Sequence, residues 1–145
     1  MGEKLYAVID TNVIVSALIS KNEESSPVKV LNRVFLGDIV PVWDDEIIKE
    51  YREVLSREKF HLNPLDIEDA LTVIIQYGLR ADRTPVPNES FPDPSDIVFY
   101  EVKMSREDAY LVTGNIRHYP DRPFVVTPRE MVGIVEGLPE EASKK

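Results

Sequence analysis

The chain has 145 residues, 43% of them hydrophobic, a length and composition that suit one domain with a buried core. It contains no cysteine and two histidines, which excludes disulfides and thiolate metal sites and argues against a histidine-rich zinc site. The formal net charge of -9 argues against a high-affinity, non-specific DNA binder, but it suits a nuclease whose carboxylates are neutralised by metal ions, or a protein with a basic partner.

The first half of the chain alternates between apolar strand patterns and helix patterns. Pro27 suits the first turn of a helix and Gly37 its end, while Asp44 and Asp45 offer an N-cap and first-turn negative charge to the next helix. The predicted strands are residues 5–9 and 39–43, and the predicted helices are residues 12–20, 27–36, 44–55 and 63–78.

The second half resumes this alternation after a proline-rich loop at residues 84–95. A short strand before this loop is compatible with the sequence. The elements predicted after the loop are a helix at 96–104, strands at 109–112 and 123–127, and a helix at 128–136. The domain is expected to span residues 1–138, with a loose tail at 139–145. The alternation predicts an α/β domain whose mainly parallel sheet is covered on both faces.

The chain shows no pattern that would place it in a membrane or direct it to secretion. No stretch approaches the length needed to span a bilayer, and the first residues lack the charged, apolar and small segments of a cleaved leader. We therefore expect a cytoplasmic protein without a membrane partner.

Asp10 is the first candidate functional residue, because it follows directly after the strand at residues 5–9. In an open parallel sheet, ligands bind outside the carboxyl ends of the strands. A buried carboxylate there costs several kcal/mol unless it is paired or binds a metal. A helix-capping Asp is an equally common explanation of this position.

Two further acids can reach the same edge of the sheet. Glu50 lies on the flank of the apolar stripe of its helix, although an exposed ion pair with Lys49 or Arg57 is the commoner role for such a residue. Asp96 opens the helix after the proline-rich loop, where it can cap that helix and still keep one oxygen free. Near Asp96, Asp93 is its competitor, and Glu101 within the apolar helix is a candidate to support the site.

The strand at residues 109–112 ends on Thr113, Gly114 and Asn115, which are expected to lie near Asp10. Alone, this segment is explained by a plain turn, since Gly and Asn both tolerate left-handed backbone angles. Together with the acids, this segment predicts a cation site, because clustered carboxylates repel one another strongly without a cation. A site made of oxygen ligands suits Mg²⁺ or Mn²⁺ rather than zinc, and such ions serve phosphoryl chemistry.

These residues, in this order, resemble the PIN-domain family of metal-dependent nucleases. The segments that carry the resemblance are residues 8–13 (VIDTNV), 48–55 (IKEYREVL), 92–101 (PDPSDIVFYE) and 111–115 (LVTGN). The chain looks most like the branch that comprises the toxins of bacterial or archaeal toxin–antitoxin pairs of the VapBC type.

The resemblance implies a three-layer α/β/α sandwich with an acidic pocket for Mg²⁺ or Mn²⁺ and cleavage of single-stranded RNA. It places Asp10, Glu50 and Asp96 at the family's first three acidic positions and Asn115 where many members have a fourth Asp. The resemblance also implies a small antitoxin protein as inhibitor, and it makes a homodimer the expected assembly.

Within this hypothesis Asp10 and Asp96 ligate the metal, and Glu50 helps directly or through water. The residues expected to orient water or phosphate are Thr11, Asn12, Thr113 and Asn115, and those expected to contact the RNA backbone are Arg117 and His118. A catalytically impaired PIN-like module that binds RNA or protein is the alternative, and Asn115 is the residue that favours it.

Two other strand-end aspartate families fit less well. A phosphatase of the haloacid-dehalogenase type needs a second Asp where Asn12 stands. A phospho-receiver domain needs an acidic pair at the first strand and a phosphorylatable Asp later, and the sequence does not fit this pattern well.

Overall fold

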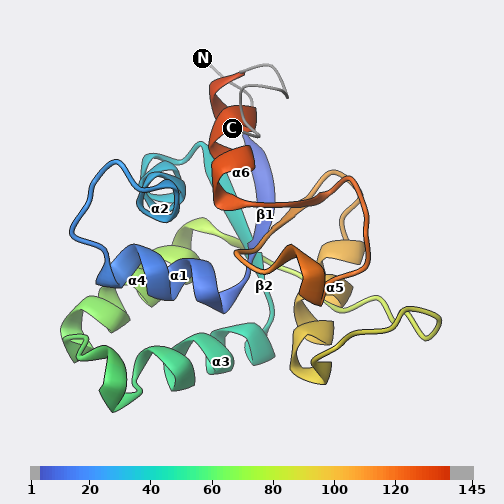
Figure 1. Cartoon of the computed structure of the whole chain (residues 1–145), viewed down its shortest axis with the longest axis horizontal. Helices are drawn as coiled ribbons and strands as arrows, with labels where there is room; N and C mark the ends of the chain where they lie inside the picture. The colour runs from blue at the N-terminus through green and yellow to red at the C-terminus, as the bar shows by residue number, and fades with distance from the viewer. Residues whose placement is uncertain (1–3, 138–145) are drawn as a thin grey trace.

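The computed structural model describes residues 4–137, which form a five-stranded sheet in the order β3-β2-β1-β4-β5 (Figure 1). The strands are β1 (Leu5–Ile9), β2 (Ile39–Trp43), β3 (Leu79–Arg80), β4 (Tyr110–Val112) and β5 (Val125–Val126). The helices are α1 (Thr11–Ile19), α2 (Ser26–Leu36), α3 (Asp45–Leu55), α4 (Pro64–Tyr77), α5 (Ile97–Met104) and α6 (Pro128–Glu136), with 3-10 turns η1 (Glu58–Phe60), η2 (Pro94–Asp96) and η3 (Ile116–His118). The predicted tail, residues 139–145, lies outside the described residues.

All neighbouring strands of this sheet run parallel, as the alternating pattern predicts. Helices α1, α2 and α4 lie to one side of the strands and α5 to the other in Figure 1. Helix α5 packs on β1 and β4, whereas α2 and α4 pack on β2. The three-layer α/β/α fold is therefore confirmed.

The central strand β1 is buried where it approaches its carboxyl end. Ala7, Val8 and Ile9 are each at most 1% exposed, since a parallel strand covered on both faces must be apolar on both. Ile9 stands in register with Val112 of β4, and the Asp10 amide donates to the Val112 carbonyl at 2.9 Å. The residues that follow the two strands, Asp10 and Thr113, therefore meet at one edge of the sheet.

Several predicted helix ends are confirmed by their capping geometry. Asp44 accepts a hydrogen bond from the Ile47 amide at 2.9 Å, and Asn63 accepts one from the Leu65 amide at 2.8 Å. Gly37 ends α2 with a φ of 87°, a left-handed conformation that glycine adopts without strain. Helix α1 begins at Thr11 and ends at Ile19, one residue earlier at each end than predicted.

Two elements of the second half also differ from their predicted bounds for reasons that the structure shows. The strand predicted at 123–127 contains only Val125 and Val126, because Pro123 has no amide to donate and the Val125 amide bonds the Arg122 carbonyl in a turn. The helix predicted from Asp96 begins instead at Ile97, because residues 94–96 form the 3-10 turn η2. No helix within residues 4–137 is long and apolar enough to cross a membrane.

Candidate functional site

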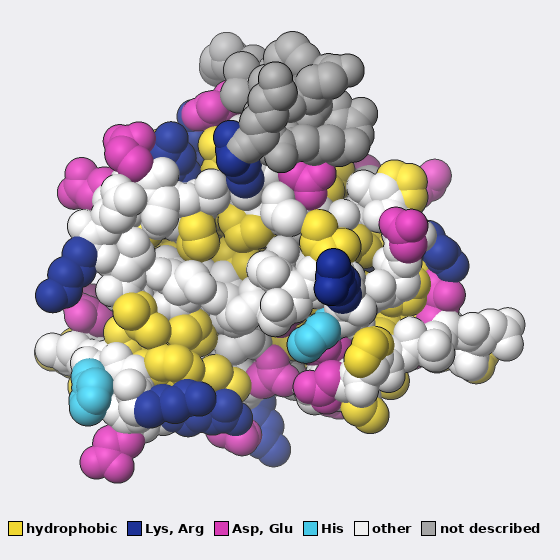
Figure 2. Space-filling view, in the orientation of Figure 1, with side chains coloured by type: hydrophobic (Ala, Val, Ile, Leu, Met, Phe, Trp, Pro, Cys, Tyr) yellow, Lys and Arg dark blue, Asp and Glu magenta, His cyan; other side chains and the backbone are white. Residues whose placement is uncertain are grey.

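One cavity of about 400 Å³ is lined by all four residues at the predicted acidic positions, although the first and the last are more than a hundred positions apart in the sequence. They are Asp10, Glu50, Asp96 and Asn115. In Figure 2, acidic side chains and a histidine gather at the middle of the face, between α1, α3 and α5 as placed in Figure 1. The predicted site residues that line the cavity are Asp10, Thr11, Asn12, Glu50, Asp93, Asp96, Asn115 and His118.

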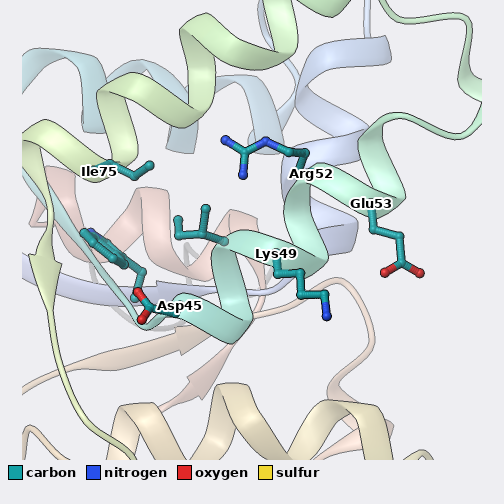
Figure 3. Close-up of a pocket in the computed structure, with 7 residues that line it drawn as sticks. Asp45, Lys49, Arg52, Glu53 and Ile75 are labelled. Carbon is teal, nitrogen blue, oxygen red and sulfur yellow. The ribbon is translucent and has the colours of Figure 1, made fainter.

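A second cavity, of about 510 Å³, lies beside α3 on its other flank (Figure 3). Its walls are largely apolar and include Trp43, Ile48 and Ile75, with Lys49 and Arg52 at the side. None of the predicted site residues lines this cavity, so we locate the candidate chemistry in the acidic one.

Asp10 is held by hydrogen bonds to one of its oxygens. Its Oδ2 accepts from Thr113 Oγ1 at 2.9 Å, from the Tyr119 hydroxyl at 3.0 Å and from Asn12 Nδ2 at 3.2 Å. Asp10 occupies the N-cap position of α1, but its side chain makes no capping hydrogen bond to that helix. Burial raises the pKa of Asp10, and the bonds from Thr113 and Tyr119 offset part of that rise.

Glu50 points toward the first turn of α1. The Thr11 hydroxyl donates to Glu50 Oε2 at 2.5 Å. Within residues 4–137 Glu50 forms no ion pair with Lys49 or Arg57, so the surface-pair explanation is wrong for this acid. Partial burial raises the pKa of Glu50, Thr11 opposes that rise, and the charges of Asp10 and Asp93 add to it.

Asp96 is buried, with 8% of its surface exposed, and one of its oxygens lacks a partner. His118 Nδ1 lies 3.3 Å from Asp96 Oδ2, yet this oxygen accepts no hydrogen bond from any residue that the structure describes. Asp96 does not cap α5 either; Asp93 caps η2 by accepting from the Ser95 amide at 3.0 Å. Burial and then repulsion by Asp10 and Asp93 raise the pKa of Asp96 to about 6, partly offset by His118.

The turns after β1 and β4 are bonded to each other. The Gly114 amide donates to Asn12 Oδ1 at 2.9 Å, and the Asn115 amide donates to Thr113 Oγ1 at 3.0 Å. A Cβ at Gly114 would stand 3.2 Å from Asn12 Oδ1, so the close approach favours glycine. These bonds leave the Asn115 side chain facing the cavity, with no hydrogen bond to any residue from 4 to 137.

Three of the predicted residues lie outside the cavity. Thr113 is fully buried behind Asp10, and Arg117 is exposed on η3 without lining the cavity. Glu101, expected to support the site, instead accepts from Arg83 Nη2 at 2.7 Å and from the Val86 amide at 2.9 Å. It therefore fastens the proline-rich segment to α5.

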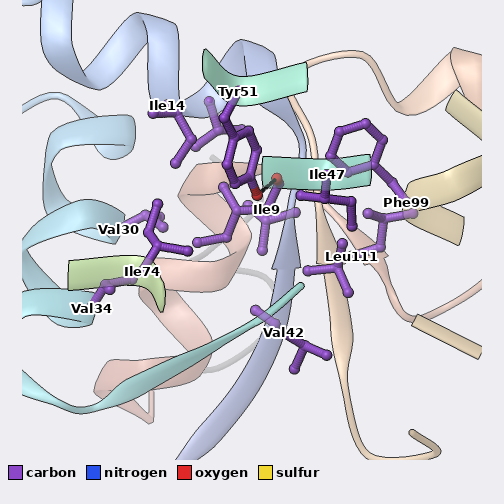
Figure 4. Close-up of a cluster of buried hydrophobic side chains, with 14 of the residues drawn as sticks. Ile9, Ile14, Val30, Val34, Val42, Ile47, Tyr51, Ile74, Phe99 and Leu111 are labelled. Carbon is purple, nitrogen blue, oxygen red and sulfur yellow. Dashed lines mark hydrogen bonds between the residues drawn. The ribbon is translucent and has the colours of Figure 1, made fainter. Parts of the chain in front are cut away.

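Two tyrosines near the site were not found from the sequence. Tyr119 donates to Asp10, and the Tyr51 hydroxyl donates to the Ile9 carbonyl at 2.5 Å (Figure 4). Tyr51 belongs to the apolar stripe of α3, so the sequence pattern predicts its burial but not the hydrogen bond of its hydroxyl. Tyr119 follows a 3-10 turn that no hydrophobic period reveals, and only its closeness to the segment 111–115 could have drawn attention to it.

The site offers oxygen ligands of the kind that hard divalent cations prefer. Among residues 4–137, no group of three acidic, histidine or cysteine side chains is arranged to hold a metal ion. Mg²⁺, however, commonly keeps several waters and uses only one or two carboxylates. The unpartnered oxygen of Asp96 fits such a cation, because a buried carboxylate oxygen that accepts no hydrogen bond is open to a metal ion.

Comparison with known proteins identifies one family. A sequence model described as PIN domain matches residues 6–117, which is more than half of the chain and includes Asp10, Glu50, Asp96 and Asn115. No curated protein and no solved structure matches the chain.

Proposed function

The chain belongs to the PIN domain family, whose members are generally nucleases, and from this premise we propose that it is a Mg²⁺- or Mn²⁺-dependent endoribonuclease acting on single-stranded RNA. The observation that carries the proposal is the meeting of Asp10, Glu50 and Asp96 in one cavity at the carboxyl edge of the sheet. The choice of single-stranded RNA rests on the resemblance of the motifs to the toxin branch.

In the proposed phosphodiester hydrolysis, the acidic residues of the cavity would hold the metal ion. Asp10 and Asp96 would hold the cation, with Glu50 contributing directly or through water. When bound, the cation supplies Lewis-acid polarisation of the phosphate and a more acidic water. Asp10 presents its ligand oxygen in a fixed orientation because Thr113 and Tyr119 hold the other one.

The polar groups around the acids are placed to position the other reactants. Asn12, Asn115 and His118 line the cavity and would orient the attacking water or the phosphate, while Thr11 holds Glu50. Attack of water on phosphorus forms one P–O bond and breaks the P–O3′ bond. The departing O3′ takes a proton, so the products carry a 5′-phosphate and a 3′-hydroxyl.

We also propose that the protein is the toxin of a toxin–antitoxin pair. The resemblance to VapBC-type toxins supports this role, and the net charge of -9 suits a small basic antitoxin that neutralises the acidic cavity. The same resemblance supports a homodimer. Size-exclusion chromatography with light scattering tests the homodimer, and co-purification with the product of a neighbouring small gene tests the antitoxin.

The first experiment is cleavage of a labelled, mixed-sequence single-stranded RNA with Mg²⁺, with Mn²⁺ and with EDTA. We expect cutting with either metal and none with EDTA, and at least 100-fold slower cutting by Asp10→Asn. Asp66→Asn is the matched control, because Asp66 is exposed on α4 and away from the cavity. Undiminished metal-dependent cleavage by Asp10→Asn would show that the site is wrongly assigned.

Asn115 favours a second candidate function, an impaired PIN-like module that binds RNA or protein without cutting. It places a neutral amide where many family members carry a carboxylate, which removes one negative charge from the cavity. Intact RNA in every reaction would leave either this module or a nuclease with a narrow target, and metal-dependent stabilisation of the fold then distinguishes them.

A further inference from the structure

The cavity that contains the three acids is also lined by an arginine and an aromatic ring. Val54 lies one helical turn beyond Glu50 on α3, and the chain then leaves the helix and turns through η1. Arg57 and Phe60, at the two ends of this turn, line the same cavity as Asp10 and Asp96. Figure 2 shows hydrophobic and basic side chains beyond the central acidic group, on the side of α1 and α3.

Arg57 is a cation without an assigned partner. It is exposed and forms no ion pair with any residue from 4 to 137, whereas Arg52, on the same segment, pairs with Glu68 at 3.1 Å. In a chain of net charge -9, an unpaired guanidinium in an acidic cavity has its donors free for an incoming anion. The planar fork of arginine matches the oxygens of a phosphate.

Phe60 is held at the cavity wall by the turn that carries it. It is half-buried and packs against the hydrophobic core while also lining the cavity. Its amide donates to the Arg57 carbonyl at 3.1 Å, and the turn ends at His61 with a φ of 52°. Lys59 Nζ lies 5.0 Å from the centre of the Phe60 ring, which adds positive charge beside it.

An aromatic ring next to an unpaired cation is the combination that binds unpaired nucleotides. Bases stack on aromatic side chains while arginine or lysine contacts the backbone, and the stacking tolerates every base. The volume of about 400 Å³ lies within the range of small-ligand sites. A nucleotide of a duplex is already stacked and cannot lay its base on Phe60 without being unpaired.

We propose that Arg57 and Phe60 form a subsite for one unpaired nucleotide next to the phosphate that is cut. Phe60 stacks on the base, and Arg57 binds the adjoining phosphate. The inference rests on the proposed ribonuclease function and deepens it by explaining a preference for single strands. Because stacking does not read base identity, this subsite contributes affinity and position, not sequence choice.

The test separates binding from cleavage by using Asp10→Asn as the parent protein in Mn²⁺. A fluorescent single-stranded RNA is titrated with the parent and with its Arg57→Gln, Phe60→Leu and Arg52→Gln derivatives, and the dissociation constants are measured by anisotropy. We expect roughly 5- to 10-fold weaker binding for the first two and a change under twofold for Arg52→Gln. The dependence of log K on log salt should become shallower by about one for Arg57→Gln and stay unchanged for Phe60→Leu.

An abasic scan of a short RNA that offers a single binding register locates the subsite. Removal of one particular base should weaken binding by the parent about as much as Phe60→Leu does, and it should have no further effect on the Phe60→Leu protein. A flat scan, or Arg57→Gln binding as well as Arg52→Gln, would overturn the subsite. Arg57 is exposed, so weaker binding by Arg57→Gln is not explained by misfolding.

The subsite and the nuclease can fail separately in these experiments. If the wild-type protein cuts no RNA and is not stabilised by Mn²⁺, but the scan shows one Phe60-dependent position, the subsite stands and the nuclease proposal falls. If the wild type cuts RNA but the scan is flat, the nuclease stands and the subsite falls. RNA that does not bind the parent at all overturns the subsite.

Discussion

Asp10 and Asp96 are both buried, yet their surroundings differ in a way that matters for function. Asp10 Oδ2 accepts three hydrogen bonds, whereas Asp96 Oδ2 accepts none from the described residues. A buried carboxylate oxygen without a partner is costly to the folded state. The energetic cost of keeping this site ionised therefore falls chiefly on Asp96.

The first prediction is that Asp96→Asn stabilises the metal-free protein at neutral pH. The folded-state pKa of Asp96 is raised from 3.8 to about 6, so protonation of Asp96 stabilises the folded protein. This contribution to stability is complete below pH 3.8 and is lost as the pH rises through about 6. Such a difference corresponds to about 3 kcal/mol at most, of which solvent screening leaves roughly 1 to 2 kcal/mol.

Denaturant unfolding in EDTA from pH 4 to pH 8 measures this effect. The gain for Asp96→Asn should be greatest at pH 7 to 8 and vanish near pH 4, while the exposed Asp66→Asn should show no such trend. A variant that is less stable than wild type at pH 7.5 would contradict the account.

The second prediction concerns Tyr119, which donates to Asp10 at 3.0 Å. Tyr119→Phe removes one hydrogen bond to a buried carboxylate, so we expect a loss of about 1 to 2 kcal/mol in the free energy of unfolding at pH 7.5. The loss should shrink at low pH, where protonated Asp10 needs less stabilisation. Tyr6→Phe is the control, because the Tyr6 hydroxyl bonds none of the residues between 4 and 137; a loss that is independent of pH would rule out the link to Asp10.

The sequence located the acids but not the bonds that hold them. Asp10 and Asp96 could be predicted from a strand end and a loop-to-helix junction. Helical arithmetic put Glu50 on the flank of its apolar stripe, but only the structure shows Thr11 holding it. Contacts such as Tyr119 with Asp10 join residues 109 positions apart, and local pattern carries no information about them.

At the scale of elements, the proline-rich segment between β3 and η2 is fixed at several points although it has little secondary structure. Glu101 accepts from Arg83 and from the Val86 amide, and the Thr84 amide donates to the Glu101 carbonyl at 2.9 Å. Farther along, Glu89 accepts from the Tyr100 hydroxyl and from Arg122. These contacts hold the segment in the conformation that places Asp93 and Asp96 at the cavity.

The third prediction is that Glu101→Gln loosens this segment. The substitution removes the charge that Arg83 pairs with and weakens the bond to the Val86 amide, for an expected loss of about 1 to 2 kcal/mol. Hydrogen exchange should become faster at the amides of residues 84 and 86 and stay unchanged at Ile47. Glu68→Gln, which breaks an exposed pair with Arg52, is the control. Equal exchange in the two variants would show that Glu101 does not fasten the segment.

Elements were predictable where one residue type decides their ends. Asp44, Asn63 and Gly37 mark helix ends by capping chemistry that acts within a few residues. The 3-10 turn at η2 and the short extent of β5 were not predictable, because their causes are local hydrogen bonds that no hydrophobic period reveals. At η2 Asp93 accepts from the Ser95 amide, and before β5 the Val125 amide bonds the Arg122 carbonyl in a turn.

At the scale of the whole molecule, the site lies at the carboxyl edge of an all-parallel sheet and draws on β1, β4 and the helices around them. A ligand that binds only the assembled site stabilises the entire fold. The domain organisation proposed from the sequence, one domain over residues 1–138, would make such stabilisation visible in a single transition.

The fourth prediction is that Mn²⁺ raises the melting temperature of the wild-type protein. At a metal concentration about 100 times the dissociation constant, the gain is roughly 2.7 kcal/mol, or about 5 to 10 °C for a domain of this size. Asp10→Asn should lose most of the shift, and K⁺ at equal ionic strength should produce little of it. A flat response of the wild type would favour the impaired binding module.

The hydrogen bond from Tyr51 to the Ile9 carbonyl has a practical consequence for capturing a complex (Figure 4). Each partner is the immediate neighbour of an acid, Glu50 on one side and Asp10 on the other, so the two acid-bearing backbones are clamped together without using either charge. Replacing an acid by its amide leaves this clamp in place. Glu50→Gln and Asp10→Asn should therefore be well-ordered traps, in which an uncut RNA can be crystallised in the cavity.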